Sequence, residues 1–403
     1  MSIFTLDEAR AAILGAVHPL APEPVPLPEA EGRILGQVVR APLSLPPFAQ
    51  SAMDGYAVRA EDTQGGGEIR LRVIGRIAAG QAPRVKLAPG TAVRIMTGAP
   101  LPEGGTAVVK QEETRCRGEY VVFHRRLRPG ENIIPRGKDV QEGERLLEAG
   151  TLITPSVLGL LASLGLTPVT VVRKPRVAIL ALGDELCEVH EALKPGQIWV
   201  SNLYSIVAQI RRYGGIPLNL GISRDRLAEI RAKLATVPAA DVYITIGGSQ
   251  RGDFDLVDDL LLAEKGEIVF RELAVNYSRS LIFGWLKGKP FFGLPGSPIA
   301  ARVSFELFVR PALWKLAGRT SWLGEQVWAE LALPIPASPR RVVAPVRLSY
   351  RERQWRALPL DRERPPSAPP LFLANGAIYP LPERDLQAGE NLLAERWEDP
   401  ASP

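Results

Sequence analysis

The sequence predicts a multidomain protein of the α/β and β class, in which a doubly wound parallel α/β domain is joined to β-rich parts. Between residues 175 and 318, buried-type strands and helices alternate strictly, which indicates a parallel sheet with right-handed crossovers. Between residues 45 and 139, short β-like runs are separated by Gly and Pro without a long helical stretch. The chain of 403 residues is also too long for a single core.

Four domains are expected, because the pattern of predicted strands, helices and Pro-rich segments changes several times along the chain. A Pro-rich connector at residues 20–39 behaves as a stiff spacer, and short Pro-rich strands follow Gly318. The expected domains are an elongated helical and extended connecting domain at residues 1–44 plus 140–174, a β-rich module at 45–139, the α/β domain at 175–318 and a C-terminal β domain at 319–403.

The first helix and the uncharged stretch Gly150–Val172 have to be distinguished from targeting and membrane segments. MSIFTLDEARAAILGAV carries acidic residues and reads as an amphipathic helix capped near Thr5, which excludes a signal peptide. In the uncharged stretch, Thr154-Pro155 predicts a helix start and Gly165 a helix stop, before the β-branched run TPVTVV. A helix followed by a strand is therefore expected, with no membrane partner.

The elements of the α/β domain follow in order. Strands are predicted where apolar runs end in Gly turns, and helices where apolar residues recur at helical spacing. The first helix of this domain, SNLYSIVAQIRRYGG, is expected to be capped at Ser201 or Asn202. The segments are PRVAILALGDEL, SNLYSIVAQIRRYGG, IPLNLGIS, RDRLAEIRAKLATV, DVYITIGG, DLVDDLLLAEKG, KPFFGLPGSP and the long helix PIAARVSFELFVRPALWKLAG.

Composition narrows the functional classes. Apolar residues make up 46% and charged residues 23%, which is typical of a folded globular protein. The net charge of +5 comes without a basic block, so nucleic acid is not expected as a partner. Cys116 and Cys187 are far apart and lack metal-type spacing, which favours the reducing cytoplasm. The three histidines lie in unrelated contexts, which disfavours a histidine triad or a zinc site.

Three turns at the carboxyl ends of predicted strands contain groups that could bind a ligand. Ligands of open α/β sheets bind at these strand ends. Gly183-Asp184-Glu185 follows one strand, and GGSQRGDFD, with Asp253, follows another. Carboxylates at such an edge can hold Mg²⁺ together with substrate phosphates. The third turn, Pro295–Pro298, offers free N–H groups at a helix start to an anion. Each turn alone is better explained as a structural cap or turn, and it is the occurrence of all three on one sheet edge that raises the case for a ligand site.

The β-rich module contains a carboxylate on a stiffened turn. In LPPFAQSAMDGYAV, two prolines hold the approach to Asp54 extended, and Gly55 is expected to supply a backbone angle that other residues avoid. The segments RIMTGAP and RGKD place Thr97, Arg136 and Asp139 on turns where they could grip anions. The alternative is that Asp54 bonds its own backbone in an Asx turn and that the others are solvated turn residues.

The sequence resembles the MoeA family, the molybdopterin molybdenumtransferases, which are related to the E domain of gephyrin. The matching segments run in family order over nearly the whole chain: LPPFAQSAMDGYAVRAEDT, RIMTGAPLPEG, GENIIPRGKDV, PRVAILALGDEL, SNLYSIVAQIRRYGG, GDFDLV, GLPGSP, FELFVRPAL and ANGAIYPLP. The resemblance implies insertion of molybdate or tungstate into adenylylated molybdopterin, with Mg²⁺-dependent release of AMP. It also implies a MogA-like molybdopterin-binding domain at 175–318, a C-terminal β-barrel and a homodimer in which Asp54 reaches into the partner's carboxylate cleft. Molybdopterin adenylyltransferase is a candidate partner.

Site residues follow from the resemblance, position by position. The catalytic residues would be Asp54, Thr97, Asp139, Glu185 and Asp253, of which Glu185 and Asp253 would hold the metal. The cofactor-binding residues would be Arg136, Asp184, Ser201, Asn202, Gly247, Gly248, Asn276, Arg279, Pro295, Gly296 and Ser297.

Two loops depart from the family pattern. GGSQRGD replaces Gly-Gly-Val-Ser-Val-Gly-Asp, and Asn276–Ser280 replaces Lys-Pro-Gly-Lys-Pro. Because Lys and Arg differ at an oxyanion site, the grip on the substrate would change. Two hypotheses remain open: a working transferase with an adjusted pocket, or a catalytically weakened paralogue that acts as a dimeric ligand- or partner-binding protein.

Overall fold

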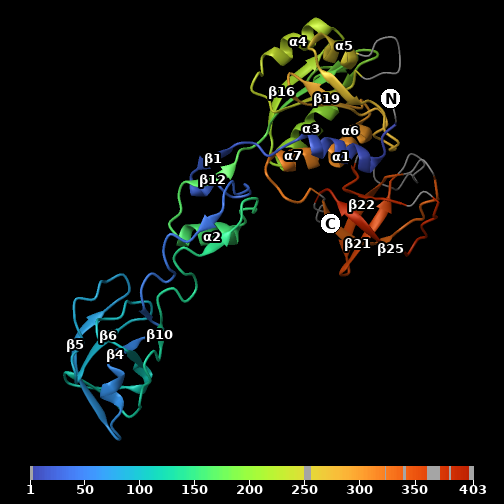
Figure 1. The fold of residues 1–403 in the computed structure, drawn as a ribbon. Helices are drawn as coiled ribbons and strands as arrows, with labels where there is room; N and C mark the ends of the chain where they lie inside the picture. Colours follow the sequence, from blue (N-terminus) through green and yellow to red (C-terminus); the bar gives the residue numbers. More distant parts are fainter. Residues whose placement is uncertain are drawn as a thin grey trace. The chain divides into compact units, whose positions relative to one another are not determined.

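A computed structural model describes residues 3–248, 256–322, 324–338, 342–360, 373–380 and 383–398 (Figure 1). The chain forms two compact units. The first comprises Met1–Gly36, Gly150–Thr154 and Pro168–Pro403, and the second comprises Gln37–Ala149 and Pro155–Thr167. The connecting domain expected at residues 1–44 and 140–174 is therefore divided between the two units.

A six-stranded sheet in the order β16-β13-β17-β20-β19-β18 forms the centre of the first unit. The first four strands in this order are parallel, and β19 and β18 add an antiparallel edge. The turn Lys287-Gly288 explains why β19 and β20 are antiparallel. Both of its residues have positive φ, and two-residue turns of this kind join antiparallel strands. The strands are β13 Arg176–Leu182, β16 Ile216–Ser223, β17 Val242–Ile246, β18 Glu267–Phe270, β19 Ile282–Leu286 and β20 Lys289–Leu294.

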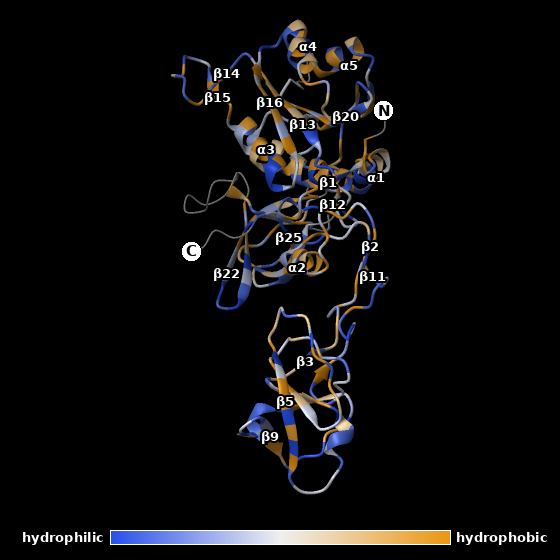
Figure 2. Cartoon of the chain, turned by 90° about the vertical axis from the view of Figure 1, so that its left-hand side faces the viewer, coloured by the Kyte–Doolittle hydropathy of each residue, from blue (hydrophilic) through white to orange (hydrophobic). Residues whose placement is uncertain are grey.

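Helices cover both faces of this sheet, as the alternating pattern predicts. Successive residues of a strand point to opposite faces. Val177 and Ile179 of β13 accordingly pack with α3, α6, α7 and α1, whereas Ala178 and Leu180 pack with α4 and α5. Hydrophobic residues lie along these strands in Figure 2. The helices are α1 Leu6–Ala16, α3 Ser201–Arg212, α4 Leu227–Ala235, α5 Leu256–Ala263, α6 Pro298–Ser304 and α7 Arg310–Leu316.

Two helix ends differ in how they are capped. Thr5 caps α1, as predicted, and forms a capping box with Glu8. The predicted cap of α3 at Ser201 or Asn202 is wrong: Val200 occupies the N-cap position without a side-chain hydrogen bond, and Ser201 is already helical.

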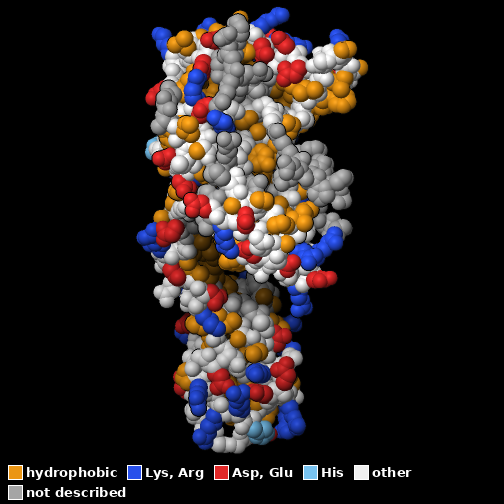
Figure 3. All heavy atoms as spheres, turned by 90° about the vertical axis from the view of Figure 1, so that its right-hand side faces the viewer, with side chains coloured by type: hydrophobic (Ala, Val, Ile, Leu, Met, Phe, Trp, Pro, Cys, Tyr) orange, Lys and Arg blue, Asp and Glu red, His pale blue; other side chains and the backbone are white. Residues whose placement is uncertain are grey.

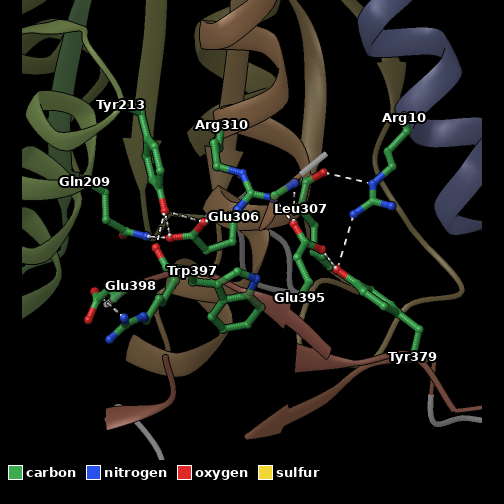
Figure 4. Close-up of polar contacts among 12 residues, drawn as sticks. Arg10, Gln209, Tyr213, Glu306, Leu307, Arg310, Tyr379, Glu395, Trp397 and Glu398 are labelled. Carbon is green, nitrogen blue, oxygen red and sulfur yellow. Dashed lines mark hydrogen bonds and ion pairs between the residues drawn. The ribbon is translucent and has the colours of Figure 1, made fainter. Parts of the chain in front are cut away.

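The long helix predicted at residues 298–318 is interrupted by a π-helical turn at Phe305–Val309. Pro311 has no N–H and cannot donate to the Leu307 carbonyl four residues earlier. Arg10 of α1 donates to that carbonyl instead, at 3.2 Å from its Nε (Figure 4). The contact between α1 and the helix thus satisfies the acceptor that the proline leaves free.

The C-terminal part forms a closed barrel in the order β21-β23-β22-β24-β25, as the resemblance implies. Val346, Leu348 and Ala357 are among its fully enclosed core residues. The strands are β21 Glu325–Leu331, β22 Ala344–Arg351, β23 Gln354–Pro359, β24 Gly376–Ile378 and β25 Asn391–Arg396.

A buried charged network joins the barrel to the helices of the α/β part (Figure 4). Arg310 at the start of α7 lies between two carboxylates, with Nη1 3.1 Å from Glu306 and Nη2 hydrogen bonded to Glu395 on β25. Tyr213 also contacts Glu306, with its hydroxyl 2.9 Å from Oε2. Arg310, Glu306 and Glu395 are at most 3% exposed, so their charges are removed from water as a group.

The stretch Gly150–Val172 forms a helix followed by a strand, as predicted. The helix α2 spans Pro155–Ser163, and β12, at Val169–Val172, pairs antiparallel with β1, at Pro22–Val25. Among the described residues, no helix has the length and apolar character needed to cross a membrane.

The second unit contains the predicted β-rich module as a six-stranded sheet in the order β7-β4-β6-β5-β9-β8. Acidic and basic side chains are interspersed over the face of the chain shown in Figure 3. The sheet comprises β4 Gly55–Val58, β5 Ile69–Ile77, β6 Thr91–Ile95, β7 Ala107–Lys110, β8 Arg115–Arg117 and β9 Tyr120–Phe123. Shorter elements of the chain are β2 Val39–Arg40, β3 Gln50–Ser51, β10 Ile133–Ile134, β11 Arg145–Leu147, β14 Leu186–Cys187, β15 Ile198–Trp199 and the 3₁₀ turns Leu27–Glu29, Ala60–Thr63 and Gln111–Glu113.

Candidate active site

A pocket of about 430 Å³ opens at the carboxyl ends of β13 and β17. The chain leaves β13 for β16 on one side and later enters β17 on the other, so the pocket lies where the direction of strand order reverses. Six predicted residues line it: Glu185, Ser201, Asn202, Gly247, Gly248 and Gly296.

Glycines bring the turns around this pocket close together. A Cβ on Gly247 would lie 2.6 Å from the Leu182 carbonyl oxygen, and both Gly247 and Gly248 have positive φ. A Cβ on Gly183 would lie 2.5 Å from the Glu185 carboxylate. Larger residues would therefore push the β13 and β17 turns apart. The close approach leaves backbone on the pocket wall, where a ligand can reach it.

Carboxylates gather on one side of the pocket. Glu185 lines it together with Asp225, which follows β16. The Asp225 N–H points to the Asp184 carboxylate at 3.4 Å. Burial, reinforced by the neighbouring charges of Asp184 and Glu185, raises the pKa of Asp225. The excess negative charge favours binding of a cation.

Asp225 is a residue that the sequence analysis missed. The sequence does contain a signal for it. Arg224-Asp225 follows the predicted strand IPLNLGIS, and ligands of open α/β sheets bind at such strand ends. The sequence analysis also missed Trp199 on β15, which lines the pocket and is 48% exposed. Its indole N–H donates to the Glu191 carbonyl at 3.1 Å, which fixes the ring at the rim.

Asn202 connects two walls of the pocket. Its side-chain N–H donates to the Gly296 carbonyl at 2.7 Å, which ties the start of α3 to the turn between β20 and α6. Ser297 in that turn occupies the N-cap position of α6 without a side-chain cap bond. Pro295, Ser297 and Asp184 thus flank lining residues, although they do not line the pocket themselves.

Asn276 and Arg279 lie elsewhere. The Asn276 side chain accepts from the N–H groups of Val342, at 2.9 Å, and Val343, at 2.8 Å. It also donates to the Val343 carbonyl at 2.6 Å. Arg279 is exposed, and neither residue lines the pocket. Their assignment to cofactor binding stays a prediction, and Asp253 lies outside the described residues.

Asp54 in the second unit is held by Thr97. Both the N–H and the hydroxyl of Thr97 donate to Asp54 Oδ1, at 2.7 and 2.8 Å. The backbone bond, followed by the hydroxyl bond, lowers the pKa of Asp54. Oδ2 accepts no hydrogen bond from any described residue, so this exposed carboxylate is fixed through one oxygen. The two predicted residues act as a pair.

Gly55 has a different role from the expected one. It does not have positive φ; instead, β4 is flanked on both sides by β6 and β7, and a Cβ on Gly55 would lie 1.9 Å from the Val109 carbonyl oxygen. The Gly that follows Asp54 is therefore required by close backbone approach.

The predicted residues Arg136 and Asp139 belong to the segment that runs beside residues 45–51. Ile133 pairs with Ser51, and the Asp139 N–H donates to the Leu45 carbonyl at 2.9 Å. The Arg136 side chain forms an exposed ion pair with Glu142 at 2.9 Å. Such a pair is weak in water, so the guanidinium can exchange its partner for an anion.

Removing the Thr97 hydroxyl tests its grip on Asp54. Thr97→Val is expected to raise the pKa of Asp54 toward its ordinary value, because one of its two donors is lost. In the folded wild type the pKa of Asp54 is below its unfolded value. Its ionised carboxylate therefore stabilises the fold at pH values above the unfolded pKa, and this contribution is lost as the pH falls through the folded pKa. NMR titration of the Asp54 carboxyl carbon measures this. Thr114→Val, which removes an exposed hydroxyl bonded to the Gln111 carbonyl, serves as the control. An unchanged Asp54 pKa in Thr97→Val would contradict the assignment.

The donor set at the pocket fits a metal that arrives with its substrate. Within the described ranges, no three His, Cys, Asp or Glu side chains converge to hold a metal ion. Mg²⁺ is usually bound through one or two carboxylates and substrate phosphates, because it keeps much of its water shell. Glu185 and Asp225 can supply such carboxylates.

Comparison with known proteins shows which family the chain resembles. Residues 4–165 match the MoeA N-terminal region (domain I and II), and residues 178–315 match a probable molybdopterin binding domain. Molybdopterin molybdenumtransferase 2 of Mycobacterium tuberculosis is 35% identical over 416 aligned residues, covering 98% of this chain and 99% of that protein. Molybdopterin molybdenumtransferase of Haemophilus influenzae is 37% identical, with 79% of each chain covered.

A solved structure extends the similarity to the whole fold. The molybdopterin biosynthesis MoeA protein from Pyrococcus horikosii superimposes with a TM-score of 0.87 at 30% identity, covering 98% of this chain and 100% of that one. Sequence and fold lead to the same assignment: the chain belongs to the MoeA family of molybdopterin molybdenumtransferases.

Proposed function

We propose that this transferase-like enzyme of molybdenum cofactor biosynthesis inserts molybdate or tungstate into adenylylated molybdopterin and releases AMP with the help of Mg²⁺. The observation that carries the proposal is the pocket at the carboxyl ends of β13 and β17, where glycine turns expose backbone beside Glu185 and Asp225. Backbone groups can bind phosphate oxygens there, while the carboxylates hold a cation.

The residues of the pocket would act mainly by positioning. Mg²⁺, when bound, neutralises phosphate charge and assists departure of AMP. Glu185 would hold it, with Asp253 as the second predicted ligand. Asn202 keeps the turn at Gly296 in place, which fixes one wall against which the substrate lies. Orientation and charge neutralisation account for catalysis without a covalent intermediate.

We further propose that the protein works as a homodimer in the cytoplasm, in which Asp54 of one copy serves the pocket of the other. The pairing of Asp54 with Thr97 supports this, because it fixes an exposed carboxylate that forms no ion pair with a basic side chain among the described residues. Thr97, Arg136 and Asp139 would then contact the oxyanion or its water. Molybdopterin adenylyltransferase is the proposed source of the adenylylated substrate.

A turnover assay tests the function. Purified protein, adenylylated molybdopterin, Mg²⁺ and molybdate or tungstate are combined, and AMP release and metal insertion are followed. Wild type is expected to release AMP only with Mg²⁺ and oxyanion. Asp54→Ala should lose this activity, whereas Glu112→Ala, an exposed carboxylate of the same unit, should retain it.

The competing hypothesis predicts a different result in the same assay. A catalytically weakened paralogue would bind adenylylated molybdopterin but release no AMP under any condition. That outcome would leave a dimeric binding protein on the same fold, and the proposed transferase activity would be wrong.

A further inference from the structure

A second pocket, of about 550 Å³, lies at the amino-terminal edge of the α/β sheet. Arg176 and Lys289 are the first residues of β13 and β20, and Asp241 immediately precedes β17. Because these strands are parallel, this edge is opposite the one that carries the candidate active site. The pocket is therefore distinct from the site described above.

Both carboxylates that line this pocket are already paired. Asp241 is 5% exposed and receives two bonds from the Arg173 guanidinium, each at 2.6 Å. Glu23 is bonded to Arg33 at 2.5 Å. The bidentate geometry fixes Arg173, since a planar guanidinium matches a carboxylate through two parallel bonds. The charge of Lys289 also acts on Asp241, although the two side chains form no ion pair.

Three further cations line the same pocket: Lys174, Arg176 and Lys289. Their side chains form no ion pair with any described residue, whereas the backbone N–H of Arg176 donates to the Asp241 carboxylate at 2.8 Å. In the strand order, β13 and β20 lie on either side of β17. Arg176 and Lys289 therefore start roughly 10 Å apart, two strand spacings, with long side chains that can converge on one ligand.

We propose that this pocket binds a small tetrahedral oxyanion, either free, as phosphate or molybdate, or as the phosphate of a nucleotide. Lys174, Arg176 and Lys289 supply the charge, and Arg173, fixed by Asp241, forms part of the wall. Arg176 can donate two bonds to one oxyanion, while the lysines act as point charges. The proposal is independent of the transferase function. Since the cations are exposed, binding weakens as salt rises.

Calorimetric titration of the full chain with phosphate, molybdate and AMP tests the proposal. The double variant Arg176→Gln, Lys289→Gln is expected to bind at least about tenfold more weakly, a loss of about 1.4 kcal/mol. Lys265→Gln removes an exposed lysine of the same unit that lines neither pocket, and should bind as wild type. AMP binding that is tighter than phosphate binding and is weakened in the double variant would identify the nucleotide as the source. Equal binding of AMP and phosphate, with both weakened in the double variant, would identify the free oxyanion.

Crystals soaked in tungstate locate the anion directly, because tungsten scatters anomalously. A peak between Arg176 and Lys289 that disappears in the double variant is expected. A peak only at the carboxyl-end pocket, or equal affinity of wild type and the double variant, would overturn the proposal. A peak in crystals without a difference in solution means binding at crystal concentration only, and also overturns it.

Discussion

Glu185→Gln is expected to lower the rate of AMP release at least about 100-fold, the effect of losing one electrostatic group at a reacting centre. Gln preserves the size of the side chain and removes its charge. Glu185 lines the pocket beside Asp225, and the Gly183 backbone leaves room for its carboxylate. If Glu185 holds Mg²⁺, the Mg²⁺ concentration for half-maximal rate should rise in the variant. Steady-state assays over a Mg²⁺ series measure both effects.

The matched control is Glu267→Gln at the exposed start of β18, on the far strand of the same sheet. It changes the net charge equally and should leave the rate and the Mg²⁺ dependence unaltered. A Glu185→Gln enzyme with wild-type rate and Mg²⁺ dependence would show that the metal is held by other groups. A lowered rate with unchanged Mg²⁺ dependence would assign Glu185 to the substrate and not to the metal.

Local sequence signals were sufficient to find much of the pocket. Glu185, Gly247 and Gly296 all follow strand ends, and parallel strands bring such ends to one edge. The placement of Asn276 could not be found this way. Its partners Val342 and Val343 are more than sixty residues away in sequence and belong to the approach to the barrel. No local pattern encodes such a contact.

The fold shows the same division between local and distant information. Alternating strands and helices, the helix cap at Thr5 and the short strands of the β-rich module were predicted from neighbouring residues. The π-helical turn before Pro311 was not, although proline itself is a local signal. What allows the turn is Arg10, which comes from the other end of the chain and satisfies the Leu307 carbonyl.

Arg310→Met is expected to destabilise the first unit by about 3–5 kcal/mol, the effect of removing one partner from a buried ion pair. The variant leaves Glu306 and Glu395 buried without the guanidinium between them (Figure 4). Arg310→Lys should fall between wild type and Met, because an ammonium cannot bridge both carboxylates as a fork does. Urea unfolding followed by tryptophan fluorescence measures the series. Arg384→Met, which breaks an exposed pair with Glu390 in the barrel, should change stability by less than about 1 kcal/mol.

The loss in Arg310→Met should also depend on pH. In wild type, burial raises the pKa of Glu395, but the Arg310 charge and the Tyr379 bond outweigh burial, so that its pKa lies below the ordinary value. Glu395 thus stabilises the fold above its unfolded pKa of about 4.3.

In the variant the Arg310 charge is gone, so burial becomes the dominant influence on the pKa of Glu395 and raises it. Burial already raises the pKa of Glu306 in wild type. Both groups then oppose folding once pH exceeds about 4.3, where the unfolded carboxyls ionise. The stability difference between wild type and variant should therefore increase from about pH 4.5 to about pH 7.5. A difference independent of pH would mean that Arg310 acts by packing against Trp314 and Tyr213 instead of by its charge.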